Sequence, residues 1–249
     1  MSPLHAIAIF AAGIVAGTIN TVVGSGTLFT FPILLAFGYA PVVANVSNTV
    51  GLVPGSMTGA IGYRRELRGQ RKRAIPLSAA SIAGGATGAV LLLVLPAAAF
   101  NAIVPAFIAV AVVLILAQPR LSRALEQRRR PAQDQPGRLA TAAVLASGIY
   151  GGYFGAAQGI LLLAILGLAV NDDLQRINAL KVVLAGLVNL VAAVVFIFAA
   201  HVAWLAALLI ALGSTVGGVV GSRAGRRLPA AALRAVIVAV GVVAIVRLV

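Results

Sequence analysis

The chain has 249 residues, 61% of them hydrophobic and 10% charged, with a mean hydropathy of +1.07, which excludes a soluble domain and indicates a membrane protein. Its net charge of +14 does not indicate nucleic-acid binding, because most Lys and Arg residues lie in short segments between apolar stretches. The absence of cysteine excludes disulfides, thiolate metal sites and a cysteine nucleophile.

Five apolar elements are expected in the first half of the chain. They cover residues 4–23, 26–38, 41–62, 75–95 and 101–117. A helix needs about 20 residues to cross a bilayer. The short second element is therefore expected to be a half-span or a re-entrant piece. Gly24, Ser25 and Gly26 separate it from the first element.

A basic segment separates this half from five further elements. These cover residues 139–156, 159–170, 174–200, 202–221 and 231–248. An offset of 133 residues aligns the two halves, for example Gly26 with Gly159 and Asn45 with Asn178. Two copies of one membrane unit, each with interrupted helices, are typical of a secondary transporter.

The basic segments indicate how the short elements are arranged. Most Lys and Arg residues fall in 64–73, 120–138 and 223–227, and positive loops favour the cytoplasmic side. All three segments lie on one face only if the first two elements of each half form a hairpin. The sequence therefore predicts an all-α polytopic membrane protein of two inverted repeats, with broken or re-entrant helix pairs and both termini outside. The repeats cover 1–117 and 139–249, and a basic cytoplasmic linker covers 118–138.

Glycines recur at every fourth position near the end of the second half. The stripe comprises Gly213, Gly217, Gly221 and Gly225. Small residues at this spacing let two helix backbones approach closely. The stripe is therefore predicted to be a packing surface, either between helices of one chain or in a homodimer.

Polar residues gather at two matching places, one near each glycine-containing break, at Gly24–Gly26 and at Gln158–Gly159. Polar groups at membrane depth are costly and point to function. Helix N-termini and exposed backbone N–H groups at such breaks can bind an anion. The candidate substrate-binding residues are Asn20, Gly24, Ser25, Gly26, Asn45, Asn48, Gln158, Gly159, Asn178 and Lys181. No metal site, catalytic residue or cofactor is expected.

Lys181 is the most informative of these candidates. It lies about one-third of a span into the element that begins near Leu174, at 1.5 Å per residue. Its ammonium group either extends to the lipid head groups or faces a central cavity beside Asn178, one turn earlier on the same face. All five acidic residues fall in expected loops. A cavity with a cation and amides but no carboxylate should prefer anions.

A further pattern runs through residues 13–67 and returns in the second half. It consists of Asn20, the Gly24–Gly26 break, Pro32, Gly38, Asn45, Asn48, Pro54, Gly55 and Tyr63, and then of Gly148–Gly155 and Asn178–Lys181. This pattern resembles the TauE/SafE family of sulfite exporters, also called 4-toluene sulfonate uptake permeases. The resemblance covers nearly the whole chain. It implies movement of sulfite, sulfonates, sulfoacetate or similar anions across a bacterial plasma membrane, without fixing which anion.

The leading hypothesis is a secondary transporter of small sulfur-containing anions that works by alternating access, in contact with membrane lipids and no nucleic acid. The alternatives are an anion channel and a cation-coupled uptake permease, for which Asp172 and Asp173 are the candidate coupling residues. An intramembrane enzyme is not expected, because the sequence has no H-E-x-x-H or G-x-S-x-G motif. Without a carboxylate inside a helix, the membrane potential is the expected driving force, and it favours export.

Overall fold

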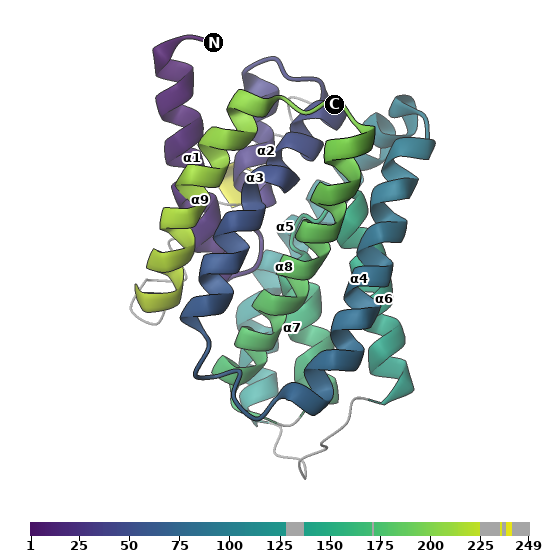
Figure 1. Ribbon diagram of the computed structural model, residues 1–249. Coiled ribbons are helices and arrows are strands. Elements are labelled where there is room, and N and C mark those ends of the chain that lie inside the picture. The colour runs from purple at the N-terminus through teal and green to yellow at the C-terminus, as the bar shows by residue number, and fades with distance from the viewer. Residues whose placement is uncertain (128–136, 171, 225–234, 236–237, 241–249) are drawn as a thin grey trace.

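The computed structural model describes residues 1–127, 137–170, 172–224, 235 and 238–240. Within this part every regular element is an α-helix, and the helices form one bundle (Figure 1). The helices are α1 (Pro3–Val22), α2 (Thr27–Ala36), α3 (Pro41–Gly62), α4 (Arg71–Val94), α5 (Ala97–Gln127), α6 (Arg138–Tyr153), α7 (Gln158–Ala169), α8 (Leu174–Ala199) and α9 (Trp204–Ala224). The last predicted element, 231–248, lies almost wholly outside the described residues.

The bundle has the features of a multi-pass membrane protein. Five of the described helices, α1, α4, α5, α8 and α9, are long and apolar enough to cross a bilayer. α3 has 22 residues but carries many of the polar side chains, and it packs against both α8 and α9. Large apolar side chains such as Phe198, which is 86% exposed, cover the outer surface. The predicted all-α polytopic fold is confirmed.

The first two helices of the chain form a hairpin, as predicted. α1 ends at Val22 and α2 begins at Thr27, so residues 4–38 are not one continuous helix. The ring of His5, at the start of α1, stacks on Phe37, just after α2, with centroids 4.3 Å apart. α2 therefore returns to the end of the bundle at which α1 begins. α6 and α7 form the second hairpin, and α2 and α7 lie toward opposite ends of the bundle (Figure 1).

Helices of each half of the chain pack against helices of the other half. α1 of the first half packs along α9 of the second half, and α6 of the second half packs along α4 of the first. α3 and α8 also pack against each other. The contacts are thus reciprocal, as two related halves would require. An inversion axis between the halves stays a prediction.

Glycines allow α9 to approach α1 closely and α4 to approach α6 closely. A Cβ added at Gly217 would overlap the backbone of Ile14 and Thr18 on α1, and a Cβ added at Gly88 would overlap Ile149 on α6. Only glycine permits backbones to approach in this way. The predicted glycine stripe on α9 is therefore an internal packing surface and is not free for a homodimer contact. Its last member, Gly225, lies outside the described residues.

The basic segments gather at one end of the bundle. One cavity there is lined by Tyr63, just after α3, and by Gln118 of α5. Another is lined by Arg64, also just after α3, and by Arg223 of α9. The ends of α3, α5 and α9 thus share one end of the bundle, which is the arrangement that the hairpin prediction requires. By the positive-inside rule this basic end is expected to face the cytoplasm.

One helix extends further than predicted. α5 was expected to end at residue 117, but it continues to Gln127, so the predicted linker begins as helix. Pro119 lies inside α5 without ending it. After this proline the sequence loses its apolar character but keeps good helix formers such as Leu, Ala, Glu and Gln. The end of the apolar stretch therefore marks where α5 leaves the hydrocarbon, not where the helix stops.

Candidate functional site

The turn between α1 and α2 meets the turn between α6 and α7 inside the bundle. The N–H of Gly159 donates a hydrogen bond to the carbonyl of Gly24 at 3.0 Å. Gly24 has a φ of 91°, a conformation that favours glycine. A Cβ on Gly24 would lie 2.6 Å from the Cα of Gly159. The second break was expected at Gln158 and Gly159, but it lies at residues 154–157, and these two residues form the start of α7. The structure thus brings the first break into direct contact with the first turn of α7.

Both turns end their first helix with the same backbone pattern. The N–H of Gly24 donates to the carbonyl of Ile19, and the N–H of Gly155 donates to the carbonyl of Tyr150. Ala157, just before α7, has a φ of 58°. This left-handed conformation costs a non-glycine residue roughly 1–2 kcal/mol. Strained and unwound backbone at membrane depth is typical of functional sites.

Lys181 reaches the end of α1. It is 1% exposed, and its Nζ donates to the carbonyl of Thr21 at 3.5 Å. Asn178, which is 8% exposed, donates through Nδ2 to the same carbonyl at 3.5 Å. Within the part of the chain that the structure describes, no carboxylate lies within 4.0 Å of Lys181. Lys181 therefore points into the protein and not toward the head groups.

Asn45 makes the matching contact at the other turn. Its Nδ2 donates at 3.0 Å to the carbonyl of Tyr153, the last residue of α6. Asn45 and Asn178 are aligned by the 133-residue offset. Each of these amides binds the interrupted end of the other half's first helix, so together they cross-link the two halves at the turns.

Asn48 and Asn20 have other partners. Asn48 is 0% exposed, and its Nδ2 donates to Oγ1 of Thr27 at 3.2 Å while its Oδ1 accepts from the hydroxyl of Thr30. Asn20 donates through Nδ2 to Oγ of Ser56 at 3.2 Å. Asn48 thus ties α3 to α2, and Asn20 ties α1 to α3. A shared cavity for Asn45, Asn48, Asn178 and Lys181 stays a prediction.

Gln158, Ser25 and Gly26 are buried at the turns. Gln158 donates through Nε2 to the carbonyl of Ser147 at 3.2 Å, which fixes α7 to α6. Gly26 packs closely against the carbonyl of Ala16 on α1. Ser25 is 1% exposed, and among the described residues its Oγ has no hydrogen-bond partner. The hydroxyl of Ser25 is therefore an uncommitted donor at the first turn.

A cavity of about 100 Å³ lies beside Asn178, on the side of the basic end. Its lining includes Gln118 and Ser122 of α5, which sequence reasoning did not single out. The one available signal was that Gln118 is the first polar residue after the apolar stretch 101–117. Sequence reasoning also missed the role of Thr21, because no residue pattern marks a backbone carbonyl as an acceptor.

Asp172 and Asp173, the candidate coupling residues, are engaged at the basic end. The carboxylate of Asp172 accepts hydrogen bonds from Arg73 and, at 2.9 Å, from Arg176. Asp173 caps α8 by accepting from the N–H of Gln175 at 2.8 Å. Lys181 lies about 12 Å further along α8, at 1.5 Å per residue. We call the contact between Gly24 and Gly159, with the side chains of Asn45, Asn178 and Lys181 that bind the ends of α6 and α1, the junction of the turns. Neither carboxylate is part of it.

The family and the relatives that match this chain each cover most of its length. The family described as sulfite exporter TauE/SafE matches residues 9–248. A probable membrane transporter protein, ORF9, from Sinorhizobium sp. is 29% identical over 241 residues, 96% of this chain and 90% of the relative. The probable membrane transporter protein YfcA of Escherichia coli K12 is 26% identical over 224 residues, 90% of this chain and 81% of the relative. A probable membrane transporter protein of Haemophilus influenzae is 24% identical over 221 residues, covering 86% and 83% respectively. No solved structure matches the chain.

Proposed function

The chain belongs to the sulfite exporter TauE/SafE family, and from that premise we propose that it carries small sulfur-containing oxyanions by alternating access. It is a multi-pass membrane transporter and not an enzyme. The anion site in this proposal is the junction of the two turns, with Lys181 as its cation. Sulfite, sulfonates and sulfoacetate form the substrate class. The bacterial relatives support a bacterial plasma membrane as the location.

The burial of Lys181 is the observation that carries the proposal. An ammonium group removed from water without a counter-ion is strongly unfavourable, and ionisable residues at membrane depth are usually functional. Lys181 is 1% exposed, has one long hydrogen bond to a carbonyl, and lacks a carboxylate partner in the described part of the chain. A bound anion would supply the missing charge.

Neutral donors near Lys181 would hold the oxygens of the anion. Asn178 shares the Thr21 carbonyl with Lys181, so both donors already converge on one point. The uncommitted hydroxyl of Ser25 lies in the same turn region. The N-terminus of α2 adds the positive end of a helix dipole, while the N–H groups of Leu28, Phe29 and Thr30 already donate to the carbonyls of Ser25 and Gly26. The three oxygens of a sulfite or sulfonate group suit such a small convergent set.

The closed conformation supports alternating access over an open pore. Lys181, Asn45 and Ser25 are each 1% exposed, so solvent does not reach the site. The cavity beside Asn178 lies on the side of the basic end. Two hairpins that enter from opposite ends and touch at their turns can separate on one side at a time. This behaviour is that of a secondary transporter.

Binding to the purified protein tests the assignment. The ligands are sulfite, sulfate, thiosulfate, taurine and sulfoacetate, with acetate as the carboxylate control, and the readout is Kd by calorimetry. We expect a sulfur oxyanion to bind, and Lys181→Met to weaken that binding by at least about 100-fold, as expected for removal of one partner of a buried charge pair. Lys72→Met, at the exposed start of α4, is the matched control and should leave Kd unchanged. Unchanged affinity in Lys181→Met would contradict the site.

A further inference from the structure

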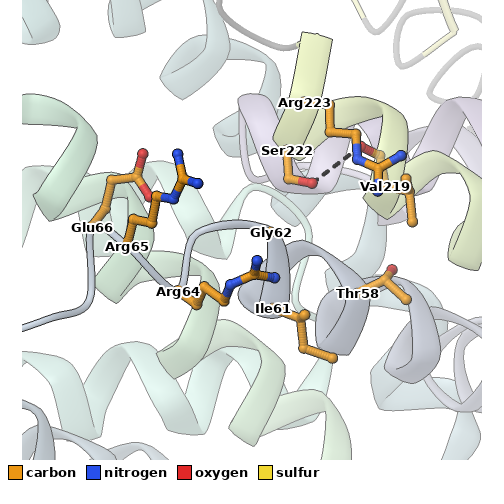
Figure 2. Close-up of a pocket in the computed structure, with 9 residues that line it drawn as sticks. All are labelled: Thr58, Ile61, Gly62, Arg64, Arg65, Glu66, Val219, Ser222 and Arg223. Atoms are coloured by element: carbon orange, nitrogen blue, oxygen red, sulfur yellow. Dashed lines mark hydrogen bonds between the residues drawn. The ribbon is translucent and has the colours of Figure 1, made fainter.

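A second pocket, of about 450 Å³, lies at the basic end between the ends of α3 and α9 (Figure 2). Its polar lining consists of Thr58, Arg64, Arg65, Glu66, Ser222 and Arg223. The volume falls in the range of ligand sites, about 300–1,000 Å³. None of these residues belongs to the junction of the turns, so the pocket needs its own explanation.

The charge of this pocket favours an anion. Three arginines and one glutamate give its lining a net charge of +2. In the described part of the chain no carboxylate lies within 4.0 Å of Arg64, Arg65 or Arg223. Their planar guanidinium groups therefore have N–H donors available for a ligand. Guanidinium binds phosphate oxygens in pairs, with good geometry.

The two hydroxyl groups of the pocket can accept hydrogen bonds but not donate them. Oγ1 of Thr58 lies 3.0 and 3.2 Å from the carbonyl oxygens of Gly55 and Thr215, which share its one proton. Oγ of Ser222 donates to the carbonyl of Val219 at 3.1 Å. Because these protons are already used, a complementary ligand carries hydroxyl groups of its own as well as an anionic group.

An apolar seam runs from the pocket along the outside of α3 and α9. Met57 and Ile61 on α3 are 54% and 59% exposed, and Val216 and Val220 on α9 are 45% and 39% exposed. Ile61 lines the pocket as well. In a bilayer these side chains contact acyl chains, directly beside the arginines. A ligand with a polar head and acyl chains complements both surfaces.

The related seam in the other half of the chain lacks the polar groups. The 133-residue offset relates Arg64 to Ile197 and Arg223 to Val90. Packing of two such helices therefore does not require arginines. Of the two related seams, the one with the arginine pocket lies at the basic end, where the anionic lipids of the cytoplasmic leaflet are expected.

We infer that the pocket binds an anionic phospholipid with a hydroxylated head group, of the phosphatidylglycerol type. Its phosphodiester contacts Arg64, Arg65 and Arg223, and its glycerol hydroxyls donate to Thr58 and Ser222. Its acyl chains lie along the apolar seam. The bound lipid joins α3 of the first half to α9 of the second.

Lipid titration of the delipidated full-length protein, followed by native mass spectrometry, tests this inference. The triple variant Arg64→Gln, Arg65→Gln, Arg223→Gln should lose affinity for phosphatidylglycerol at least about tenfold, because it removes the charge-assisted hydrogen bonds of three guanidinium groups to the phosphodiester. The control triple Arg71→Gln, Arg120→Gln, Arg138→Gln removes the same charge from exposed positions at the same end. It should change the affinity less than about twofold, because these side chains are exposed and do not line the pocket. Single Arg64→Gln and Arg223→Gln variants should each show part of the loss if the triple does not fold.

Two further arms separate a lipid from a soluble anion. Phosphatidylcholine should bind more weakly than phosphatidylglycerol, and inorganic phosphate or glycerol 1-phosphate should not displace the lipid at equal concentration. Equal losses in the two triple variants would mean general attraction to the basic end and would overturn the inference. Displacement by inorganic phosphate would also overturn it, because the pocket would then be a soluble-anion site.

Discussion

Lys181 combines a charged group with complete burial, and the two are hard to reconcile unless a ligand provides the second charge. In the ligand-free protein this arrangement should be destabilising. We therefore expect Lys181→Met, which keeps the length of the side chain, to stabilise the ligand-free protein by about 1–4 kcal/mol, as for other buried charges replaced by apolar groups. Thermal unfolding in detergent measures this difference. A large loss of stability would instead mean that Lys181 is a structural residue.

Asp172 is the second residue with an unusual electrostatic setting. Burial alone would raise the pKa of its carboxyl, but hydrogen bonds from Arg73, Arg176 and the backbone N–H of Asp173 lower that pKa below its ordinary value of 3.8. Because its pKa is lowered in the folded state, the ionised carboxylate of Asp172 stabilises the fold. This stabilisation is fully present above pH 3.8 and is lost as the pH falls through the folded-state pKa.

The variant Asp172→Asn should therefore be less stable than wild type at pH 7, by about 1–3 kcal/mol for lost hydrogen bonds to charged groups. The difference should shrink as the pH drops below 3.8. Unfolding curves of both proteins from pH 7 to pH 3 test this expectation. A difference that is independent of pH would show that charge on Asp172 does not contribute.

Some of the candidate residues could be placed from sequence, and others could not. The shared face of Lys181 and Asn178 followed from 3.6-residue periodicity, and both side chains donate to the carbonyl of Thr21. The depth of Lys181 in the bilayer stays a prediction. The partners of Asn48 did not follow, because its hydrogen bonds to Thr27 and Thr30 depend on how α2 rotates against α3. That rotation is decided by packing over the whole hairpin.

At the scale of elements, the contact between the two turns depends on Gly24. Gly24→Ala introduces a Cβ that would lie 2.6 Å from the Cα of Gly159, in addition to the left-handed φ of 91°. Gly38→Ala is a matched control, because Gly38 has a similar φ of 84° but nothing within 4 Å of an added Cβ.

Both substitutions should carry the backbone cost of roughly 1–2 kcal/mol. Gly24→Ala should lower the free energy of unfolding by about 1–3 kcal/mol more, through overpacking. It should also weaken anion binding at least about tenfold, because a loss of about 1.4 kcal/mol in binding free energy is a factor of ten in Kd. Melting curves and Kd values for the two variants measure the two effects. Equal behaviour of Gly24→Ala and Gly38→Ala would show that the turns need not touch.

Element boundaries illustrate what periodicity and composition can and cannot predict. The hairpins followed from the short second elements together with the positions of the basic segments. The end of α5 did not, because residues 118–127 are polar yet helix-forming, and hydropathy does not distinguish a helix that leaves the membrane from a loop.

At the scale of the whole molecule, the hairpins and the basic end predict the orientation in the membrane by the positive-inside rule. The chain has no cysteine, so single cysteines can report exposure. We expect Gly137→Cys, at the basic end and with nothing within 4 Å of an added Cβ, to react with an impermeant maleimide only after the cells are permeabilised. His201→Cys, in the loop after α8, should react in intact cells. Labelling of Gly137→Cys in intact cells would mean that the protein has the opposite orientation.

In the proposed mechanism, the reciprocal packing of the halves would let one site face each side of the membrane in turn. α1 is bound to α9 and α6 to α4, so each hairpin is held by a helix of the other half. Repacking at either pair can therefore expose the junction of the turns from one end while the other stays closed. The membrane potential then favours outward movement of an anion by roughly 2.3 kcal/mol per charge per 100 mV.

Efflux of labelled sulfite from proteoliposomes tests the central claim most directly, with right-side-out protein and a potential set by potassium and valinomycin. The rate should saturate with sulfite concentration, should rise when the lumen is made negative, and should fall to the protein-free level in Lys181→Met but not in Lys72→Met. Flux that does not saturate would indicate a channel. Flux that ignores the potential and follows a proton or sodium gradient, or that persists in Lys181→Met, would contradict potential-driven transport through this site.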